Sequence, residues 1–307
     1  MSAPSRTVGE ALRAAAARLD AAGNASARRD AEVLLGWLLG GARTALIIRS
    51  DEPLDAGVAA RLDALIERRL CGEPVAYLTG EKEFFSLPFA VDARVLIPRP
   101  ETEELVEVAL GVLQRLVATR AAAGGGAALQ LVDVGTGSGA IAVALLHESR
   151  RRWPDLALRA TALDVSRGAL AVARGNAAAH LEPGALSFVQ GHLTSALRPR
   201  SVALLLANPP YLSDDDLAAV SAEVAHEPVA ALLGGGKDGM KILRELLADA
   251  TQVLGPGGFV VSEIGWTQGG LVGALAQDLG FEEVRVLPDL AGHDRVLVAR
   301  WREPAAG

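Results

Sequence analysis

The sequence of 307 residues predicts an α/β protein, with a mostly parallel sheet covered by helices on both faces and preceded by a small bundle of helices. Three observations predict this class. Helical periodicity runs through residues 7–75, strand-like and helix-like segments alternate in the remainder, and a glycine-rich turn joins an early strand to a helix. We therefore expect a helical bundle at 1–75, a hairpin linker at 76–100 and an α/β domain at 101–307.

The bundle is predicted from short amphipathic segments that end at glycine or proline. Helices are expected over residues 8–19, 25–39 and 56–70. Thr7 and Glu10 have the spacing of a capping box before the first helix, and Asp55 can cap the third. Helices of this length bury their apolar stripes by packing against one another.

The linker is predicted from two aromatic segments that flank a turn. Phe84-Phe85 and Phe89-Ala90-Val91 are expected to pair around Ser86-Leu87-Pro88. The prolines on both sides of Arg99 fix their own φ angles and make a stiff joint, after which a helix is expected over 101–117. Segment 121–128 contains three consecutive glycines and is expected to be a flexible insertion, to which we assign no function.

The α/β domain is predicted from apolar runs that alternate with helical segments. Strands are expected near 130–134, 158–163, 186–190, 202–207, 258–263, 282–287 and 295–301. One of the intervening helices covers 241–254 and is expected to end at Gly255-Pro256-Gly257-Gly258. The short link between the final two strands predicts that the last strand is antiparallel. In sheets of this type, ligands bind beyond the carboxyl ends of the parallel strands.

A glycine-rich turn after the first of these strands predicts a nucleotide-like ligand. Gly135-Thr136-Gly137-Ser138-Gly139 follows strand 130–134 and precedes a helical run. The glycines let the backbone approach a ligand closely, and the helix N-terminus offers free N–H groups. NAD enzymes share such turns, but the spacing G-x-G-x-G, rather than G-x-G-x-x-G, favours S-adenosylmethionine over a dinucleotide.

Asp164 ends the second strand of the α/β domain. A carboxylate at this place can accept hydrogen bonds from both hydroxyls of a ribose. The alternative is that Asp164 caps the helix expected over 166–173. Taken together with the glycine loop and Asn208, the ligand interpretation is favoured.

The strand over 202–207 ends in Asn208-Pro209-Pro210-Tyr211, a stiff segment that is rich in hydrogen-bond acceptors. Proline disfavours helical backbone at the preceding residue, and neither proline has an N–H group. The side-chain oxygen of Asn208 and the carbonyl of Pro209 can accept both hydrogens of a planar –NH₂ group, on which Tyr211 can stack. The alternative is a rigid turn.

With these motifs, the chain resembles the bacterial protein-(glutamine-N5) methyltransferases that modify peptide chain release factors. The resemblance covers almost the whole length and is carried by these segments: Ile97-Pro98-Arg99-Pro100-Glu101-Thr102-Glu103, Asp133-Val134-Gly135-Thr136-Gly137-Ser138-Gly139, Asn208-Pro209-Pro210-Tyr211, Glu227-Pro228 with the glycines that follow, and Glu263-Ile264-Gly265. Asn208-Pro209-Pro210-Tyr211 alone also fits adenine-N6 methyltransferases of nucleic acids. The segment from Ile97 to Glu103 is more discriminating, and enzymes that methylate a ribosomal-protein glutamine differ there.

The resemblance implies a seven-stranded, Rossmann-like class I methyltransferase domain whose bundle helps to recognise a release factor. S-adenosylmethionine would donate a methyl group to the side-chain nitrogen of the glutamine in a Gly-Gly-Gln motif. Asn208, Pro209 and Tyr211 would act as catalytic residues, and Pro210 would join them in binding the substrate. The glycine loop, Asp164 and Asn208 would contact the cofactor, while Glu227 and Glu263 are candidates for supporting the site.

One position departs from the family. After its third strand the family usually has an acidic residue that binds the adenine amino group, whereas this sequence has Gly191-His192-Leu193. A neutral His192 can accept through a ring nitrogen or stack on adenine, with Leu193 beside it. The alternative is a solvent-facing histidine, with adenine held by backbone groups and apolar walls.

Composition limits the partners. The net charge is −7, from 30 Lys and Arg against 37 Asp and Glu, which argues against a broad nucleic-acid surface. No stretch approaches the length of a membrane span, and no signal sequence is evident. The single cysteine, Cys71, fits a reducing cytosol, and no histidines have metal-ligand spacing. We expect a monomeric, cytoplasmic enzyme without metal, membrane contact or direct nucleic-acid binding.

Overall fold

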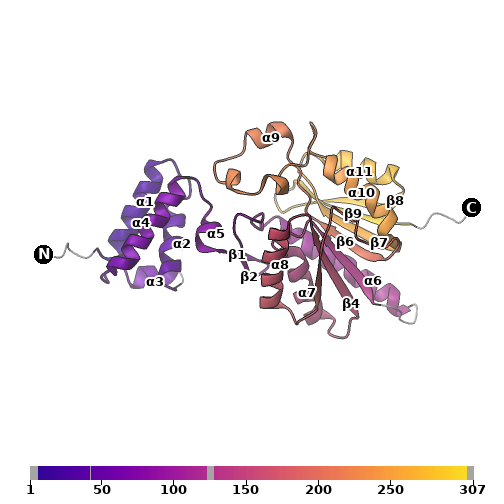
Figure 1. The fold of residues 1–307 in the computed structure, drawn as a ribbon, viewed down its shortest axis with the longest axis horizontal. Coiled ribbons are helices and arrows are strands. Elements are labelled where there is room, and N and C mark those ends of the chain that lie inside the picture. Colours follow the sequence, from indigo (N-terminus) through magenta and orange to yellow (C-terminus); the bar gives the residue numbers. More distant parts are fainter. Residues whose placement is uncertain (1–5, 42, 123–127, 303–307) are drawn as a thin grey trace, which may run out of the picture. The chain divides into compact units, whose positions relative to one another are not determined.

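A computed structural model of the chain describes residues 6–41, 43–122 and 128–302. These residues form two compact units, one containing the chain through Glu81 together with Val220–His226, and the other containing Lys82–Ala219 and the chain from Glu227 onward (Figure 1). The helical unit therefore includes a short segment from within the region expected to be the α/β domain. Most of the expected insertion at 121–128 lies outside the described residues.

The helical unit confirms the predicted bundle helices and adds two short ones. Its helices are α1 (Val8–Ala21), α2 (Ala27–Leu38), α3 (Arg43–Ile48), α4 (Ala56–Leu70) and α5 (Val75–Thr79). The predicted capping box is present, because Thr7 and Glu10 bond each other's backbone N–H groups. Leu19, Leu34 and Ile66 are fully buried between the helices. The helices α3 and α5 span too few residues to show a period in the sequence.

An ion-pair network attaches Val220–His226 to the bundle. Arg69 of α4 donates to Asp30 of α2 and to Glu223, each at 2.8 Å. Arg69 and Asp30 are only 8 % and 7 % exposed, so water does not stabilise these charges and each needs the other as its ion-pair partner. His226 lies 3.2 Å from the carbonyl oxygen of Cys71, which adds a second polar contact. The segment is thereby part of the bundle's structure.

Replacing Arg69 with alanine is expected to destabilise the helical unit by about 3 kcal/mol, because the Asp30 carboxylate would remain buried without its partner. Arg68→Ala is the matched control. Arg68 pairs with Glu73 at an exposed position, where an ion pair contributes at most about 1 kcal/mol. Urea unfolding of the two variants measures both values, and equal losses would contradict the assignment of Arg69 as a buried anchor.

The α/β unit contains a seven-stranded sheet within the described residues. Its strands are β3 (Leu129–Val134), β4 (Leu158–Asp164), β5 (Leu186–Gln190), β6 (Val202–Ala207), β7 (Leu254–Glu263), β8 (Phe281–Pro288) and β9 (Asp294–Trp301). The strand order is β5-β4-β3-β6-β7-β9-β8, with β3 to β7 parallel and β9 antiparallel to both neighbours. The prediction of a mainly parallel sheet with an antiparallel last strand is confirmed.

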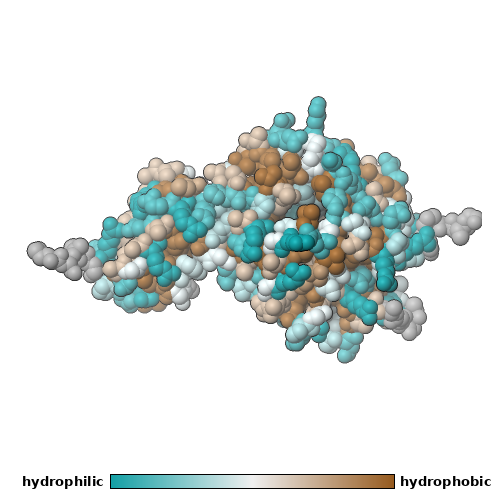
Figure 2. All heavy atoms as spheres, in the orientation of Figure 1, coloured by the Kyte–Doolittle hydropathy of each residue, from teal (hydrophilic) through white to brown (hydrophobic). Residues whose placement is uncertain are grey.

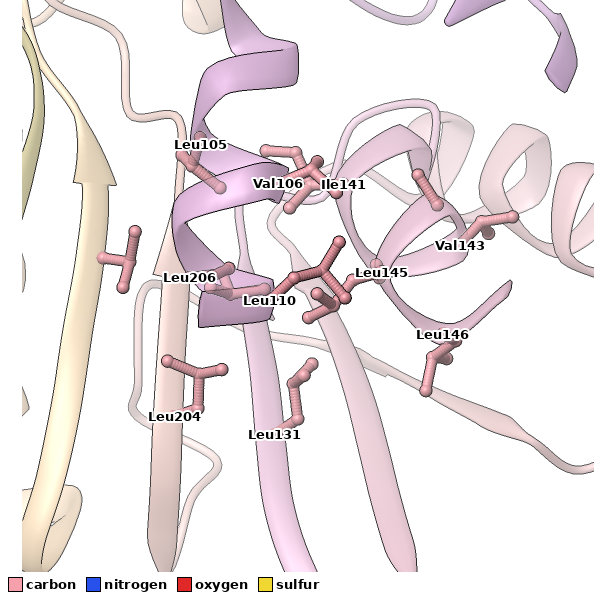
Figure 3. Packing of buried hydrophobic residues seen from close by; sticks show 14 of the residues in the cluster. Leu105, Val106, Leu110, Leu131, Ile141, Val143, Leu145, Leu146, Leu204 and Leu206 are labelled. Atoms are coloured by element: carbon pink, nitrogen blue, oxygen red, sulfur yellow. The ribbon is translucent and has the colours of Figure 1, made fainter. Parts of the chain in front are cut away.

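Alternate strand residues face two separate cores. The larger helices of this unit are α6 (Thr102–Ala122), α7 (Ala140–Arg152), α8 (Arg167–His180), α10 (Lys241–Val253) and α11 (Gly269–Asp278). Leu131, Leu204 and Leu206 point toward α6 and α7 (Figure 3). Leu205 and Ala207 of the same strand β6 pack with residues of α10 and α11 instead. Both faces of the sheet are therefore covered, which explains the continuous apolar runs of its central strands.

The hairpin differs from its prediction in the position of its turn. Strands β1 (Glu81–Phe84) and β2 (Leu87–Ala90) are joined by Phe85 and Ser86, which both have positive φ angles. A two-residue turn of this kind normally favours Asn-Gly, so the sequence offered no signal for it. The Glu103 carboxylate accepts a hydrogen bond of 2.8 Å from the Phe85 N–H, and this contact from α6 holds the turn.

Strand β7 also begins earlier than predicted, because residues 254–257 belong to it as well. The helix α10 ends one residue earlier than expected, and Leu254 already has an extended backbone.

On the face of the molecule in Figure 2, hydrophobic and hydrophilic residues are interspersed. In the described part of the chain, no helix has the length and apolar character needed to cross a membrane.

Candidate functional site

A cavity of about 730 Å³ lies at the carboxyl ends of the parallel strands in the α/β unit. It is lined by the residues that directly follow four strands: Gly135 after β3, Val165 after β4, Gly191 after β5 and Asn208 after β6. The crevice expected from the strand order is therefore present. The segment that leads into α6 and the segment that follows Glu227 complete the lining, notably with Arg94, Arg99, Thr102 at the start of α6, Pro228 and Val229.

The glycine loop needs glycine for two different reasons. Gly135 and Gly137 have φ angles of 71° and 54°, and a Cβ atom added to either would meet no atom within 4 Å. Their backbone is open to the cavity, as a ligand cradle requires. Gly139 has a φ of 83°, but its Cβ would lie 3.1 Å from the Cβ of Ala173 in α8. It therefore permits close packing of α7 against α8.

Asp164 holds the glycine loop in position. One carboxylate oxygen accepts from the Gly137 N–H at 2.9 Å, and the other accepts from the Ser166 N–H at 2.8 Å. The helix cap is Ser166, whose side chain accepts from the Ala169 N–H, so the alternative that Asp164 itself is the N-cap is wrong. Each carboxylate oxygen of Asp164 keeps a second lone pair for a ligand hydroxyl.

The side-chain amide of Asn208 is held by a buried chain of hydrogen bonds. Its Nδ2 donates to the Thr102 hydroxyl oxygen at 3.2 Å, and the Thr102 hydroxyl donates to Glu263 Oε2 at 2.6 Å. Thr102 begins α6 and Glu263 ends β7, so three separate elements meet here. With its N–H directed at Thr102, Asn208 has its oxygen available for a hydrogen-bond donor.

Two glycines pack directly against the backbone of Pro210 and Tyr211. A Cβ atom on Gly234 would lie 2.6 Å from the Pro210 carbonyl oxygen and 1.9 Å from that of Gly239. A Cβ atom on Gly239 would lie 2.0 Å from the Tyr211 carbonyl oxygen. Leu212 also exchanges backbone hydrogen bonds of 2.9 Å with Leu232 and Gly234. The segment after β6 is therefore fixed by backbone contacts that exclude any side chain.

The joint before α6 is fixed by Glu227. This buried carboxylate accepts from the Ile97 N–H at 3.0 Å and forms an ion pair with Arg99. Arg99 therefore faces a carboxylate while still lining the cavity. The contact joins residues that are 128 positions apart and closes this side of the site.

Burial alters the acidity of two carboxyl groups beside the cavity. It raises the pKa of Glu263 from 4.5 to about 7, against the opposing effect of the hydrogen bond from Thr102. It also raises the pKa of Asp133 from 3.8 to about 6, although Thr136 donates to this carboxylate. Both groups therefore change charge close to neutral pH.

The raised pKa of Glu263 predicts a stability effect that depends on pH. Between about pH 4.5 and 7 the folded chain retains a proton that the unfolded chain has released, so this group's contribution to stability is lost as pH rises. Glu263→Gln should therefore be more stable than wild type at pH 8, by an amount of order 3 kcal/mol, and equally stable below pH 4.5. Thermal unfolding across this range tests it; a constant difference between the proteins would contradict it. Glu83→Gln makes the same change of charge at an exposed position and serves as the control.

Most of the residues predicted for the site line the cavity. They are Gly135, Thr136, Gly137, Ser138, Asp164, His192, Leu193, Asn208, Pro209 and Pro210. Gly139 and Tyr211 each directly follow a lining residue in the sequence, but they do not line the cavity themselves. His192 is exposed at the rim. The site prediction left out Arg94, Val165 and Val229, for which the sequence offered no chemical signal.

Comparison with known proteins identifies the family. The model of the PrmC N-terminal domain matches residues 10–80, and that of the methyltransferase small domain matches residues 114–240. The "Release factor glutamine methyltransferase" of Moorella thermoacetica is 41 % identical over 298 residues, covering 97 % of this chain and 99 % of that protein. The chain belongs to the release factor glutamine methyltransferase family. The resemblance inferred from the sequence motifs is thereby confirmed.

Other relatives agree on the family and the fold. The protein of the same name from Burkholderia pseudomallei is 41 % identical over 271 residues, covering 87 % of this chain and 89 % of that protein. The structure of the hMettl16 catalytic domain in complex with MAT2A 3′UTR hairpin 1 has a TM-score of 0.54, with 12 % identity and 82 % of each chain covered. At this identity the likeness concerns the fold alone. This member of the release factor glutamine methyltransferase family thus has the class I methyltransferase fold that its motifs predict.

The described residues hold no cluster of three or more His, Cys, Asp or Glu side chains suited to a metal ion.

Proposed function

We propose that this protein transfers a methyl group from S-adenosylmethionine to the side-chain nitrogen of the glutamine in the Gly-Gly-Gln motif of a peptide chain release factor. The observation that carries the proposal is the orientation of Asn208, whose N–H is bonded to Thr102 and whose oxygen remains available beside the cavity. Family membership supports the choice of a release-factor glutamine over an adenine.

The residues of the cavity fit the proposed cofactor. Gly135 and Gly137 leave open backbone where a ligand would lie, and Asp164 has lone pairs for ribose hydroxyls. Exposed Val165 and Val229 offer apolar surface for a flat base, with His192 at the rim. When bound, S-adenosylmethionine supplies a methyl group on a sulfonium sulfur, which makes that carbon electrophilic.

The proposed chemistry asks the protein mainly for orientation. A glutamine amide is a poor nucleophile, because its lone pair is delocalised into the carbonyl. The Asn208 oxygen and the Pro209 carbonyl accept its two N–H groups and direct the nitrogen at the methyl carbon. When the cofactor is bound, its sulfonium sulfur would be the leaving group for the methyl carbon, and one amide proton would pass to solvent. Such positioning can lower the barrier by several kcal/mol, up to about 7–11 in ideal cases.

The Asn208 and Pro209 oxygens also stabilise the positive charge that develops on the substrate nitrogen. Positive charge develops on the amide nitrogen as it gains the methyl group, and two oxygens already directed at its hydrogens stabilise that charge. Asp214 and Asp216 lie further along the chain in the short helix α9 (Asp214–Ala218), where Ser213 and Asp216 form a capping box. Asp216 therefore has a structural role at the start of this helix.

The experiment that tests the function is methylation of a purified release factor with isotope-labelled S-adenosylmethionine, followed by peptide mapping. A single methyl group on the glutamine of Gly-Gly-Gln is the expected result. Transfer to DNA or RNA, recognised because nuclease removes the label, would replace the proposal with the adenine-N6 alternative that Asn208-Pro209-Pro210-Tyr211 also fits. Label on a ribosomal protein glutamine would likewise overturn it.

The proposed substrate also suggests where the enzyme acts. Release factors function in translation termination, so we place the enzyme in the bacterial cytoplasm, acting as a monomer on its protein partner. Size-exclusion chromatography combined with light scattering measures the oligomeric state.

A further inference from the structure

Glu263, Thr102 and Asn208 form a series of hydrogen bonds whose direction determines which way the Asn208 amide faces. A hydroxyl group has one hydrogen to donate. The Thr102 hydroxyl lies 2.6 Å from Glu263 Oε2 and 3.2 Å from Asn208 Nδ2, so its single hydrogen can point at only one of these two side chains. When it donates to an ionised Glu263, its oxygen must accept from Asn208. The –NH₂ group of Asn208 is then turned toward Thr102.

A protonated Glu263 permits the reverse direction. Its carboxyl hydrogen can be donated to the Thr102 oxygen, which frees the Thr102 hydrogen to point toward Asn208. The amide oxygen of Asn208 is the partner for that hydrogen, so the amide can then rotate and present –NH₂ to the cavity. An –NH₂ group cannot accept from the –NH₂ group of a glutamine, so this form of the site is inactive.

We propose that Thr102 and Glu263 are positioning residues that hold the Asn208 amide with its oxygen toward the methyl acceptor, and that the negative charge of Glu263 sets this direction. The inference rests on the proposed function, because it gives Asn208 the role of hydrogen-bond acceptor. Thr102 begins α6, Glu263 ends β7 and Asn208 follows β6, so the tertiary structure brings these three groups together.

The groups around Glu263 make its charge responsive to pH. Its carboxyl is 1 % exposed at the end of β7. Arg295 of β9 and Arg99 of the joint favour the charged form, whereas Glu101 opposes it. Burial opposes the charge most strongly and raises the pKa to about 7. The phenol of Tyr211 also interacts with this carboxyl, and its own pKa is raised, so Tyr211 remains neutral while Glu263 titrates. Methyl transfer is therefore expected to increase as pH rises through 7.

Thr102→Val keeps the shape of the side chain and removes both its donor and its acceptor. We expect kcat to fall by about 10- to 100-fold, because the Asn208 amide loses its fixed orientation. The affinity for S-adenosylmethionine, measured by calorimetry, should be unchanged. Thr102→Ser restores the hydroxyl and should recover most of the lost activity. Glu263→Gln lacks the negative charge and does not titrate, so its activity should be low and should not change as pH passes through 7.

A second measurement does not depend on the methyl acceptor. The side-chain ¹⁵N–H signals of Asn208 are identified as those missing from Asn208→Ala. In wild type and in Thr102→Ser they should shift with pH through the titration of Glu263, and in Thr102→Val and Glu263→Gln they should not. If wild type fails to methylate a release factor and these signals still titrate as expected, the proposed function fails and the orientation of Asn208 by Glu263 stands.

Three results would overturn the inference. The first is a Thr102→Val variant that keeps the wild-type kcat and pH profile, which would show that orientation of Asn208 does not require the hydroxyl. The second is a fall in its cofactor affinity as large as the fall in its kcat/KM, which would make Thr102 a cofactor ligand instead. The third is a set of Asn208 signals that do not change with pH in wild type. If Thr102→Val does not fold, the comparison of wild type with Thr102→Ser and Glu263→Gln still decides between these outcomes.

Discussion

Asn208→Ala is expected to reduce methyl transfer by about 10²- to 10³-fold, the size of effect seen when one preorganised hydrogen-bonding group is removed from an active site. The substitution removes the oxygen that accepts from the substrate amide, and it also removes the bond to Thr102. The ligand contacts expected from the glycine loop and Asp164 remain. Cofactor affinity should therefore change little while turnover is lost.

Single-turnover kinetics with a release factor, and calorimetry with S-adenosylmethionine, separate these two effects. Thermal unfolding of the variant serves as the control for folding, since Asn208 is only partly buried. A variant that keeps wild-type turnover would remove Asn208 from the catalytic role. A variant that loses cofactor affinity in proportion to turnover would show that Asn208 acts mainly on the cofactor.

Gly234→Ala should be the most damaging substitution among the glycines near the site. The added methyl group would lie 1.9 Å from the Gly239 carbonyl oxygen and 2.8 Å from the Tyr211 Cα, both backbone atoms. Because no flexible side chain can move aside, the backbone after β6 must shift. Overpacking of this kind costs typically about 1–3 kcal/mol, and a displacement of about 1 Å at the acceptor segment is expected to lower kcat by about 100-fold.

Gly175→Ala is the matched control, because Gly175 lies within α8 and its added Cβ would meet no atom within 4 Å. Alanine is favoured over glycine inside a helix by about 1 kcal/mol, so this variant should gain stability and keep its activity. Urea unfolding and methyl transfer are measured for both variants. Equal activity of Gly234→Ala and wild type would show that the segment after β6 tolerates movement.

Local sequence patterns were sufficient for the arrangement of elements. The alternation of apolar runs and helices predicted each strand of the large sheet to within a few residues, and the glycine-rich turn after β3 located a loop that lines the cavity. Such patterns involve only residues that are close together in the sequence, because backbone sterics and the period of the apolar residues determine them. The prediction was wrong at the hairpin turn, because a contact from Glu103 stabilises a backbone conformation that Phe85 and Ser86 do not favour by themselves.

The candidate site was predictable as a set of segments but not as a set of contacts. Asn208, Asp164 and the glycine loop each follow a strand, and the parallel order brings those ends together. The sequence suggested Glu227 and Glu263 as supporting residues without indicating their partners. The structure pairs Glu227 with the joint at Ile97 and Arg99, and Glu263 with Thr102.

The sequence by itself determined the fold class, the family, and the glycine loop and Asn208 segment that line the cavity. The tertiary structure alone decided that Thr102 links Asn208 to Glu263, that Gly234 supports Pro210, and that Arg69 holds Val220–His226. The physical reason is distance along the chain: Thr102 is 161 residues from Glu263 and 106 from Asn208. Contacts between such residues depend on strand order, register and side-chain packing, which arise only when the whole sheet and its helices have assembled.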